Sequence, residues 1–147
     1  MPPQTQLAEM SMDEFAEALR AHPWILLPLG ATEEHGPHLS LGTDLLYAEH
    51  VSAAVAARVK GLVGPGLPYG VCRTMRNFPG TISLSPGTLT LLLREILAEF
   101  VRHGARKLAL VAGHAEASQL DAMREAAVPL VNADPCLLYT SPSPRDS

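Results

Sequence analysis

The sequence predicts one α/β domain with three layers, α/β/α, in which a mostly parallel sheet lies between helices. A chain of 147 residues has the length of a single domain and can bury a substantial core. Two short apolar runs, Trp24 to Leu29 and Lys107 to Val111, are bounded by turn residues, as is typical of strands buried on both faces. Helical and extended segments alternate along the chain, and this order favours right-handed crossovers between parallel strands.

The elements follow in order from local signals. Ser11-Met12-Asp13-Glu14 has the form of a capping box, which predicts a helix to about Arg20. After the first strand, the Ala-rich stretch from Leu45 to Lys60 has helical propensity and an amphipathic pattern. Glycine and proline punctuate Gly61 to Pro68, where we expect a brief strand.

The second half repeats this pattern. Ser85-Pro86 offers a cap and a proline at the first helical position, so a helix should start there. The expected elements are an extended segment over 81–84, a helix to about His103 that ends at Gly104, the strand over 107–111, and a helix through roughly Ala127.

The last twelve residues, C-L-L-Y-T-S-P-S-P-R-D-S, have neither the bounds of a strand nor the periodicity of a helix. One interpretation is a flexible tail. The other is that Leu137 to Ser141 back-translates to CTCTTATACACATCT, which resembles a transposase adapter used for sequencing libraries. We therefore interpret residues 1–135 as the N-terminal part of one domain that is incomplete at its C-terminus. Residues 136–147 are interpreted as an adapter-derived, non-native tail that packs on nothing.

Charge and composition exclude several classes of function. The net charge is −4 and the pI about 5.8, without the basic stripe that tracks a phosphate backbone, so nucleic acid is not an expected partner. No secretory signal and no membrane-spanning apolar run can be read, and a cytoplasmic location is the default expectation. Cys72 and Cys136 lack CxxC spacing, so any metal should be held by His, Asp and Glu.

Ionisable residues cluster behind both predicted strands, where the loops of an open α/β sheet place ligands. The clusters comprise Glu33, Glu34, His35, His38 and Asp44 after the first strand, and His114 and Glu116 after the second. Carboxylates combined with imidazoles suit Zn²⁺ or Mn²⁺, and a bridging aspartate is the usual way to hold two such ions. The alternative is a solvated loop followed by an aspartate that only caps a helix.

Four separated segments resemble the creatininase family of amidohydrolases. Residues 28–44 (P-L-G-A-T-E-E-H-G-P-H-L-S-L-G-T-D) resemble its signature P-x-G-[SA]-x-E-x-H-G-x-H-L-P-x-x-T-D. Phe78-Pro79-Gly80-Thr81, His103-Gly104-Ala105-Arg106 and Gly113-His114-Ala115-Glu116 resemble further family segments in the family's order. The resemblance covers about Trp24 to Ala127.

The resemblance implies a two-metal centre with Zn²⁺ and/or Mn²⁺. Glu33 and His114 would bind one ion, His35 and Glu116 the other, and Asp44 would bridge them. Such a pair of ions makes hydroxide available near neutral pH and polarises the carbonyl under attack.

Other residues of the signature have less defined roles. His38 is expected to hydrogen-bond a ligand in the catalytic site, and Glu34 to be solvated or to support a metal ligand. We interpret Cys72 as an inert loop residue, with lining of the substrate pocket as the alternative.

The implied activity is metal-dependent hydrolysis of the C–N bond of a cyclic amide, amide or formamide in a small molecule. Ser40 replaces the proline of the signature, and Ala115 and Ala117 replace an aromatic residue and an asparagine of creatininase proper, so creatinine is a doubtful substrate. The resemblance also implies a homo-oligomer, commonly a hexamer, and a general acid beyond Pro135. The alternatives are a non-catalytic metal- or ligand-binding α/β module and an inactive fragment.

Overall fold

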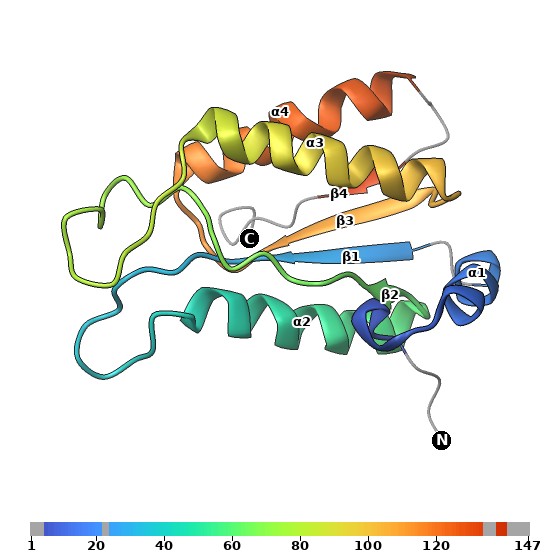
Figure 1. Cartoon of the computed structure of the whole chain (residues 1–147), viewed down its shortest axis with the longest axis horizontal. Coiled ribbons are helices and arrows are strands. Elements are labelled where there is room, and N and C mark those ends of the chain that lie inside the picture. Colours follow the sequence, from blue (N-terminus) through green and yellow to red (C-terminus); the bar gives the residue numbers. More distant parts are fainter. Residues whose placement is uncertain (1–4, 22–23, 134–137, 141–147) are drawn as a thin grey trace.

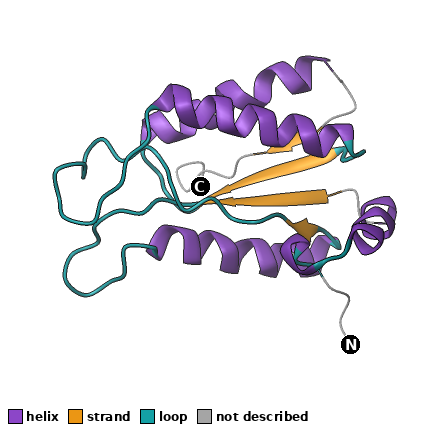
Figure 2. Cartoon of the chain, viewed as in Figure 1, coloured by secondary structure: helices purple, strands orange, loops and turns teal. Residues whose placement is uncertain are grey.

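The computed structural model describes residues 5–21, 24–133 and 138–140. Its sheet has the order β2-β1-β3-β4, and every pair of neighbouring strands is parallel (Figure 2). The strands are β1 (Trp24–Leu29), β2 (Leu62–Val63), β3 (Lys107–Ala112) and β4 (Leu138–Thr140).

Helices cover both faces of this sheet. The short 3-10 helix η1 and helix α1 precede the sheet, α2 lies along one face, and α3 and α4 lie along the other (Figure 1). Their bounds are η1 Leu7–Glu9, α1 Met12–Ala21, α2 Thr43–Val59, α3 Pro86–Arg102 and α4 Ala117–Ala133. The three-layer α/β/α arrangement and the parallel sheet predicted from the sequence are therefore confirmed.

The two central strands are buried on both faces and pair in register from Trp24 opposite Lys107 to Leu29 opposite Ala112. Side chains that alternate along β1 and β3 point to opposite layers. One set packs with α3 and α4 in the main core, and the other, which includes Leu26 and Val111, packs with Ala56 of α2. Because parallel strands in register end at the same edge, the loops after β1 and β3 emerge side by side.

Local capping signals act as expected. The Ser11 N–H donates to Glu14 Oε2 at 2.7 Å, and the Glu14 N–H donates back to Ser11 Oγ at 3.4 Å, which completes the capping box. Ser85 caps α3 by accepting from the Thr88 N–H at 3.2 Å, with a proline at the first helical position. These helix starts depend only on neighbouring residues.

The C-terminal region differs from expectation in two places. Helix α4 continues to Ala133, six residues past the predicted end, with Pro129 inside it. The expectation that residues 136–147 pack on nothing is wrong for Leu138–Thr140, which forms β4 beside Lys107–Ala109 of β3. An open edge of β3 offers unpaired N–H and C=O groups, so even a short extended segment can add to it. The rest of that tail lies outside the described residues, and its adapter origin stays a prediction.

Within the described residues, no helix combines the length and the apolar character needed to cross a bilayer.

Candidate metal centre

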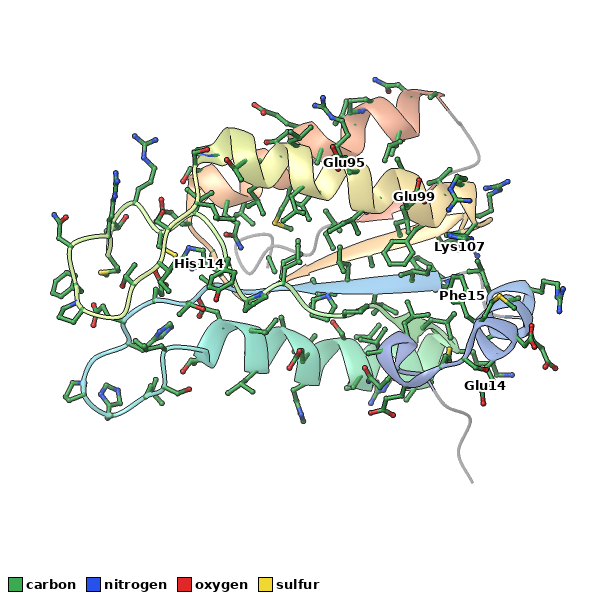
Figure 3. All side chains as sticks on the ribbon, viewed as in Figure 1. Glu14, Phe15, Glu95, Glu99, Lys107 and His114 are labelled. Carbon is green, nitrogen blue, oxygen red and sulfur yellow. The ribbon has the colours of Figure 1, made fainter. Side chains whose placement is uncertain are left out.

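The ionisable residues singled out in the sequence lie at the edge of the sheet where β1 and β3 end. His114, four positions after Leu110 in β3, lies at this edge, whereas Lys107 and Phe15 lie toward the opposite end (Figure 3). The loops that follow β1 and β2 extend past the same edge (Figure 1). The site is thus built from chain segments that are distant in the sequence.

Asp44 is delivered to this edge by the first turn of α2. Gly42, not Asp44, is the N-cap residue, and Asp44 is 7% exposed, so the alternative of a simple capping aspartate is wrong. Two glycines let α2 approach the strand ends. A Cβ at Gly30 would overlap the backbone of Leu45, and one at Gly113 would overlap the backbone carbonyl of Asp44. The glycine after each strand is therefore required for the position of the aspartate.

His114 faces two carboxylates with one ring nitrogen and a backbone carbonyl with the other. Its Nε2 lies 2.9 Å from the Val71 carbonyl oxygen, which can only accept, so Nε2 carries the proton of the neutral ring. Nδ1 lies 3.0 Å from Glu33 Oε1 and 3.0 Å from Asp44 Oδ2. In the neutral ring, a nitrogen lone pair therefore meets two carboxylate oxygens.

His35 has the same arrangement on the other side of Asp44. Its Nδ1 donates to the Glu33 carbonyl oxygen at 3.1 Å, and its Nε2 lies 3.0 Å from Asp44 Oδ1. Each Asp44 oxygen thus faces a different imidazole nitrogen, and a backbone carbonyl fixes the tautomer of each ring. Histidines that bind metal ions are usually oriented by such a second hydrogen bond.

In the metal-free protein, the pKa values of His114, His35 and Glu33 are all raised. Burial alone would lower the pKa of His114, but its contact with Asp44, its bond to Val71 and the nearby Glu33 carboxylate raise it. Burial would also lower the pKa of His35, but the hydrogen bond to the Glu33 carbonyl and the contact with Asp44 outweigh burial and raise it. The pKa of Glu33 is raised by burial and by Asp44, against the effect of His114.

The residues present fit divalent cations. Among the described residues, Asp44 Oδ2 is buried without a hydrogen-bond partner of adequate geometry, and no Lys or Arg pairs with Glu33, Asp44 or Glu116. A buried carboxylate oxygen without such a partner is costly unless a cation meets it. Two sets of ligand atoms each lie within 4.8 Å of one another: Glu33, His35 and Asp44, and Glu33, Cys72 and His114.

Glu116 is not in either set. Its Oε2 accepts from the backbone N–H of Arg73 at 2.8 Å and of Thr74 at 3.3 Å, and its Oε1 accepts from Ser118 Oγ at 2.8 Å. In this arrangement the glutamate holds the 73–74 backbone at the site. The assignment of Glu116 as a metal ligand stays a prediction.

The two remaining residues of the signature lie away from the ligand sets. His38 is exposed, and among the described residues no hydrogen bond or ion pair connects it to the cluster. The Glu34 carboxylate accepts from the Gly36 N–H at 2.9 Å within its own turn. The expected contact of His38 with a ligand remains a prediction, and Glu34 acts locally in the loop.

Two residues beside the metal centre had no role there assigned from the sequence, although lining of the substrate pocket was the alternative for Cys72. Cys72 is fully buried beside Glu33 and His114, and burial with the Glu33 carboxylate raises the pKa of its thiol to about 12. Gln119, 1% exposed, accepts from the Val71 N–H at 2.9 Å and donates to the Gly30 carbonyl at 3.3 Å. Neither has a spacing signal, because both enter the site through contacts across the fold.

The fold and the site define a three-layer α/β protein with a carboxylate–imidazole centre at the carboxyl edge of a parallel sheet. Comparison with known proteins identifies one family. Residues 8–139 match the family model "Creatininase: Creatinine amidohydrolase", and the chain belongs to this family.

Individual relatives agree with this assignment. The chain is 40% identical over 118 residues to creatinine amidohydrolase of Pseudomonas putida, which covers 76% of this chain and 45% of the relative. It is 37% identical over 117 residues to the mycofactocin precursor peptide peptidase of Mycobacterium ulcerans, with 74% and 46% covered. The chain therefore spans about half the length of these relatives.

Solved structures confirm the fold. A crystal structure of creatininase superimposes with a TM-score of 0.87 at 30% identity, covering 95% of this chain and 57% of the other. Two further creatininase structures, one a mutant of Zn-Zn type and one described with Mn, give TM-scores of 0.89 and 0.86 at 30% and 31% identity.

Proposed function

We propose that this chain carries the metal centre of a metal-dependent amidohydrolase that hydrolyses C–N bonds of small amides. Glu33, His35, Asp44, His114 and Glu116 would hold two divalent ions, Zn²⁺ and/or Mn²⁺. The observation that carries the proposal is the position of Asp44, whose two oxygens face two imidazoles that backbone carbonyls hold in the metal-binding tautomer. The Zn-Zn and Mn forms of creatininase support the choice of ions.

Two ions held there would supply Lewis-acid activation of a water molecule and of the substrate carbonyl. The protein residues have separate tasks. Asp44 and Glu33 provide the negative charge that concentrates cations at the sheet edge, and burial of Asp44 keeps that charge from being screened by water. The Val71 and Glu33 carbonyls hold both rings in position, which lowers the cost of ordering ligands upon binding.

The class of bond is better supported than the substrate. The relatives include a creatinine amidohydrolase and a mycofactocin precursor peptide peptidase, and both names denote hydrolysis of an amide-type C–N bond. We propose a small amide or peptide-like amide as the substrate, with His38 as a hydrogen-bonding contact to it. A homo-oligomeric state, as a hexamer, and a cytoplasmic location are parts of the same proposal, and sedimentation of the purified protein tests the first.

The test combines metal binding with turnover. The chain is stripped with a chelator and titrated calorimetrically with Zn²⁺ and with Mn²⁺, and hydrolysis is then followed on creatinine, a formamide and a short peptide. We expect two ions per chain, and any hydrolysis only when ions are bound. The matched control is Glu34→Gln, since among the described residues the Glu34 carboxylate hydrogen-bonds only the Gly36 N–H of its own turn. Absence of binding in the unmodified chain, or equal losses from Glu34→Gln and Glu33→Gln, would contradict the proposal.

A further inference from the structure

Cys72 lies where one of the two candidate ions would bind. Its side chain is buried, and its sulfur lies within 4.8 Å of a Glu33 carboxylate oxygen and an imidazole nitrogen of His114. Burial and the nearby Glu33 carboxylate both raise the pKa of the thiol. Ligand atoms of a tetrahedral zinc site with ordinary bond lengths are roughly 3.3 to 3.7 Å apart, so the three side chains need only a small contraction to share one ion.

Hydrogen bonds fix the backbone of Cys72 and of its two neighbours in the chain, Val71 and Arg73. The Cys72 N–H donates to Ser83 Oγ at 2.9 Å, and the preceding Val71 is held at its N–H by Gln119 and at its carbonyl by His114. The following N–H, of Arg73, donates to Glu116. Four separate contacts thus position a thiol that would otherwise lie in an unconstrained loop.

A second observation points to a cation at the same place. Asp44 Oδ2 is buried without a hydrogen-bond partner among the described residues, and it lies 3.0 Å from the His114 nitrogen that faces Glu33. The ring nitrogen, a Glu33 oxygen and the sulfur thus form one set of ligand atoms, and the Asp44 oxygen lies beside the nitrogen of that set. The three-residue set offers one N, one O and one S atom, and Asp44 adds a second oxygen next to the His114 nitrogen.

We propose that Cys72 is a protein ligand of the ion shared by Glu33 and His114, and that its sulfur makes this position prefer Zn²⁺ to Mn²⁺. The inference rests on the metal centre of the proposed function. Carboxylate and imidazole donors accept both ions, whereas a thiolate is a soft donor that suits Zn²⁺ and is a poor ligand for Mn²⁺. On binding, the sulfur gives its proton to solvent and donates an electron pair to the ion, without a change of oxidation state.

The position that faces His35 has no sulfur within its set of ligand atoms. The two positions should therefore differ in selectivity, with the Glu33–His114 position filling with Zn²⁺ and the His35 position accepting either ion. This asymmetry is a property of this sequence, because it depends on the cysteine at position 72.

The test uses Co²⁺ as a spectroscopic probe of sulfur ligation. The metal-free chain carrying Cys136→Ser, so that Cys72 is its only thiol, is titrated with CoCl₂ and monitored for sulfur-to-cobalt charge-transfer absorption in the near ultraviolet. We expect this absorption to appear with the first equivalent and to be lost in Cys72→Ser. In competition titrations, Cys72→Ser should weaken Zn²⁺ binding by roughly 10- to 100-fold at one site, with less than about threefold change for Mn²⁺.

The outcomes separate this inference from the proposed function. Two ions bound without sulfur-to-cobalt absorption would overturn the role of Cys72 and leave the metal centre intact. No ion bound by the unmodified chain would overturn both. The absorption of the Cys136→Ser chain decides the question even if Cys72→Ser does not fold, because it requires no change at the site. An unchanged preference for Zn²⁺ over Mn²⁺ in a folded Cys72→Ser would refute the selectivity.

Discussion

Replacing Asp44 with alanine should remove both ions, because among the described residues it is the one carboxylate that lies against an imidazole nitrogen of both His35 and His114. Its two oxygens each lie 3.0 Å from an imidazole nitrogen, so the substitution removes one donor from each ion position at once. Residues that only orient a metal ligand already contribute about 10- to 100-fold to affinity. A residue that binds the ion directly should contribute at least the upper end of this range. We therefore expect the affinity for each ion to fall by at least about 100-fold, or about 2.7 kcal/mol.

The assay is calorimetric titration of the metal-free variant with Zn²⁺, with elemental analysis after dialysis to count the ions retained. Unmodified protein should retain two ions and Asp44→Ala fewer than one, with hydrolysis lost in parallel. Glu34→Ala is the control, since its carboxylate also follows β1 but, within the described part of the chain, hydrogen-bonds only the Gly36 N–H. Far-ultraviolet circular dichroism of the metal-free variants checks that both are folded.

Two ions retained by Asp44→Ala, with affinities within about threefold of the unmodified protein, would refute the reasoning. That result would mean that the close contacts with both histidines are only ion pairs of the metal-free protein. Equal losses from Asp44→Ala and Glu34→Ala would instead show that the wrong carboxylate has been assigned as the bridge.

Three further predictions test the scaffold. Gln119→Leu should lower the free energy of unfolding by about 2 to 4 kcal/mol in urea titrations, because a buried N–H and a buried carbonyl lose their partner; a change below 0.5 kcal/mol would contradict this. Gly113→Ala should weaken Zn²⁺ binding as well as stability, since its Cβ must displace the first turn of α2, and unaltered affinity would count against a positioning role. Without metal, the raised pKa values of His35 and His114 give stability that is fully present below about pH 6.5 and lost as the pH rises through the folded-state values. Denaturation midpoints measured in chelator should therefore fall as the pH rises above about 6.5, and a rise instead would show the wrong sign.

The elements that the sequence predicted well are those fixed by neighbouring residues. The capping box at Ser11 and the cap at Ser85 are satisfied within one turn of their helices. The apolar run of β1 needs no distant information to be recognised as a buried strand, and its bounds are confirmed. Placement of the two ionisable clusters at one edge follows from the parallel sheet, because strands that run the same way end on the same side.

Errors arose where a local signal competed with tertiary contacts. Pro129 favours an earlier end to α4, yet packing of Ala126 and Ala127 in the core accompanies a helix that continues to Ala133. The segment Leu138–Thr140 has no strand signal of its own, but the open edge of β3 supplies backbone partners for it.

By itself, the sequence determined which donors the centre contains, since residue types and their positions after two strands are properties of the chain. Only the tertiary structure decided how they meet. The contact between Asp44 and His114 depends on two glycines that let α2 cross the strand ends, and Cys72 joins through the loop after β2. Glu116 bonds to the backbone at Arg73, some forty residues away. Such contacts are set by the crossovers and the close packing of layers, which no local pattern of side chains specifies.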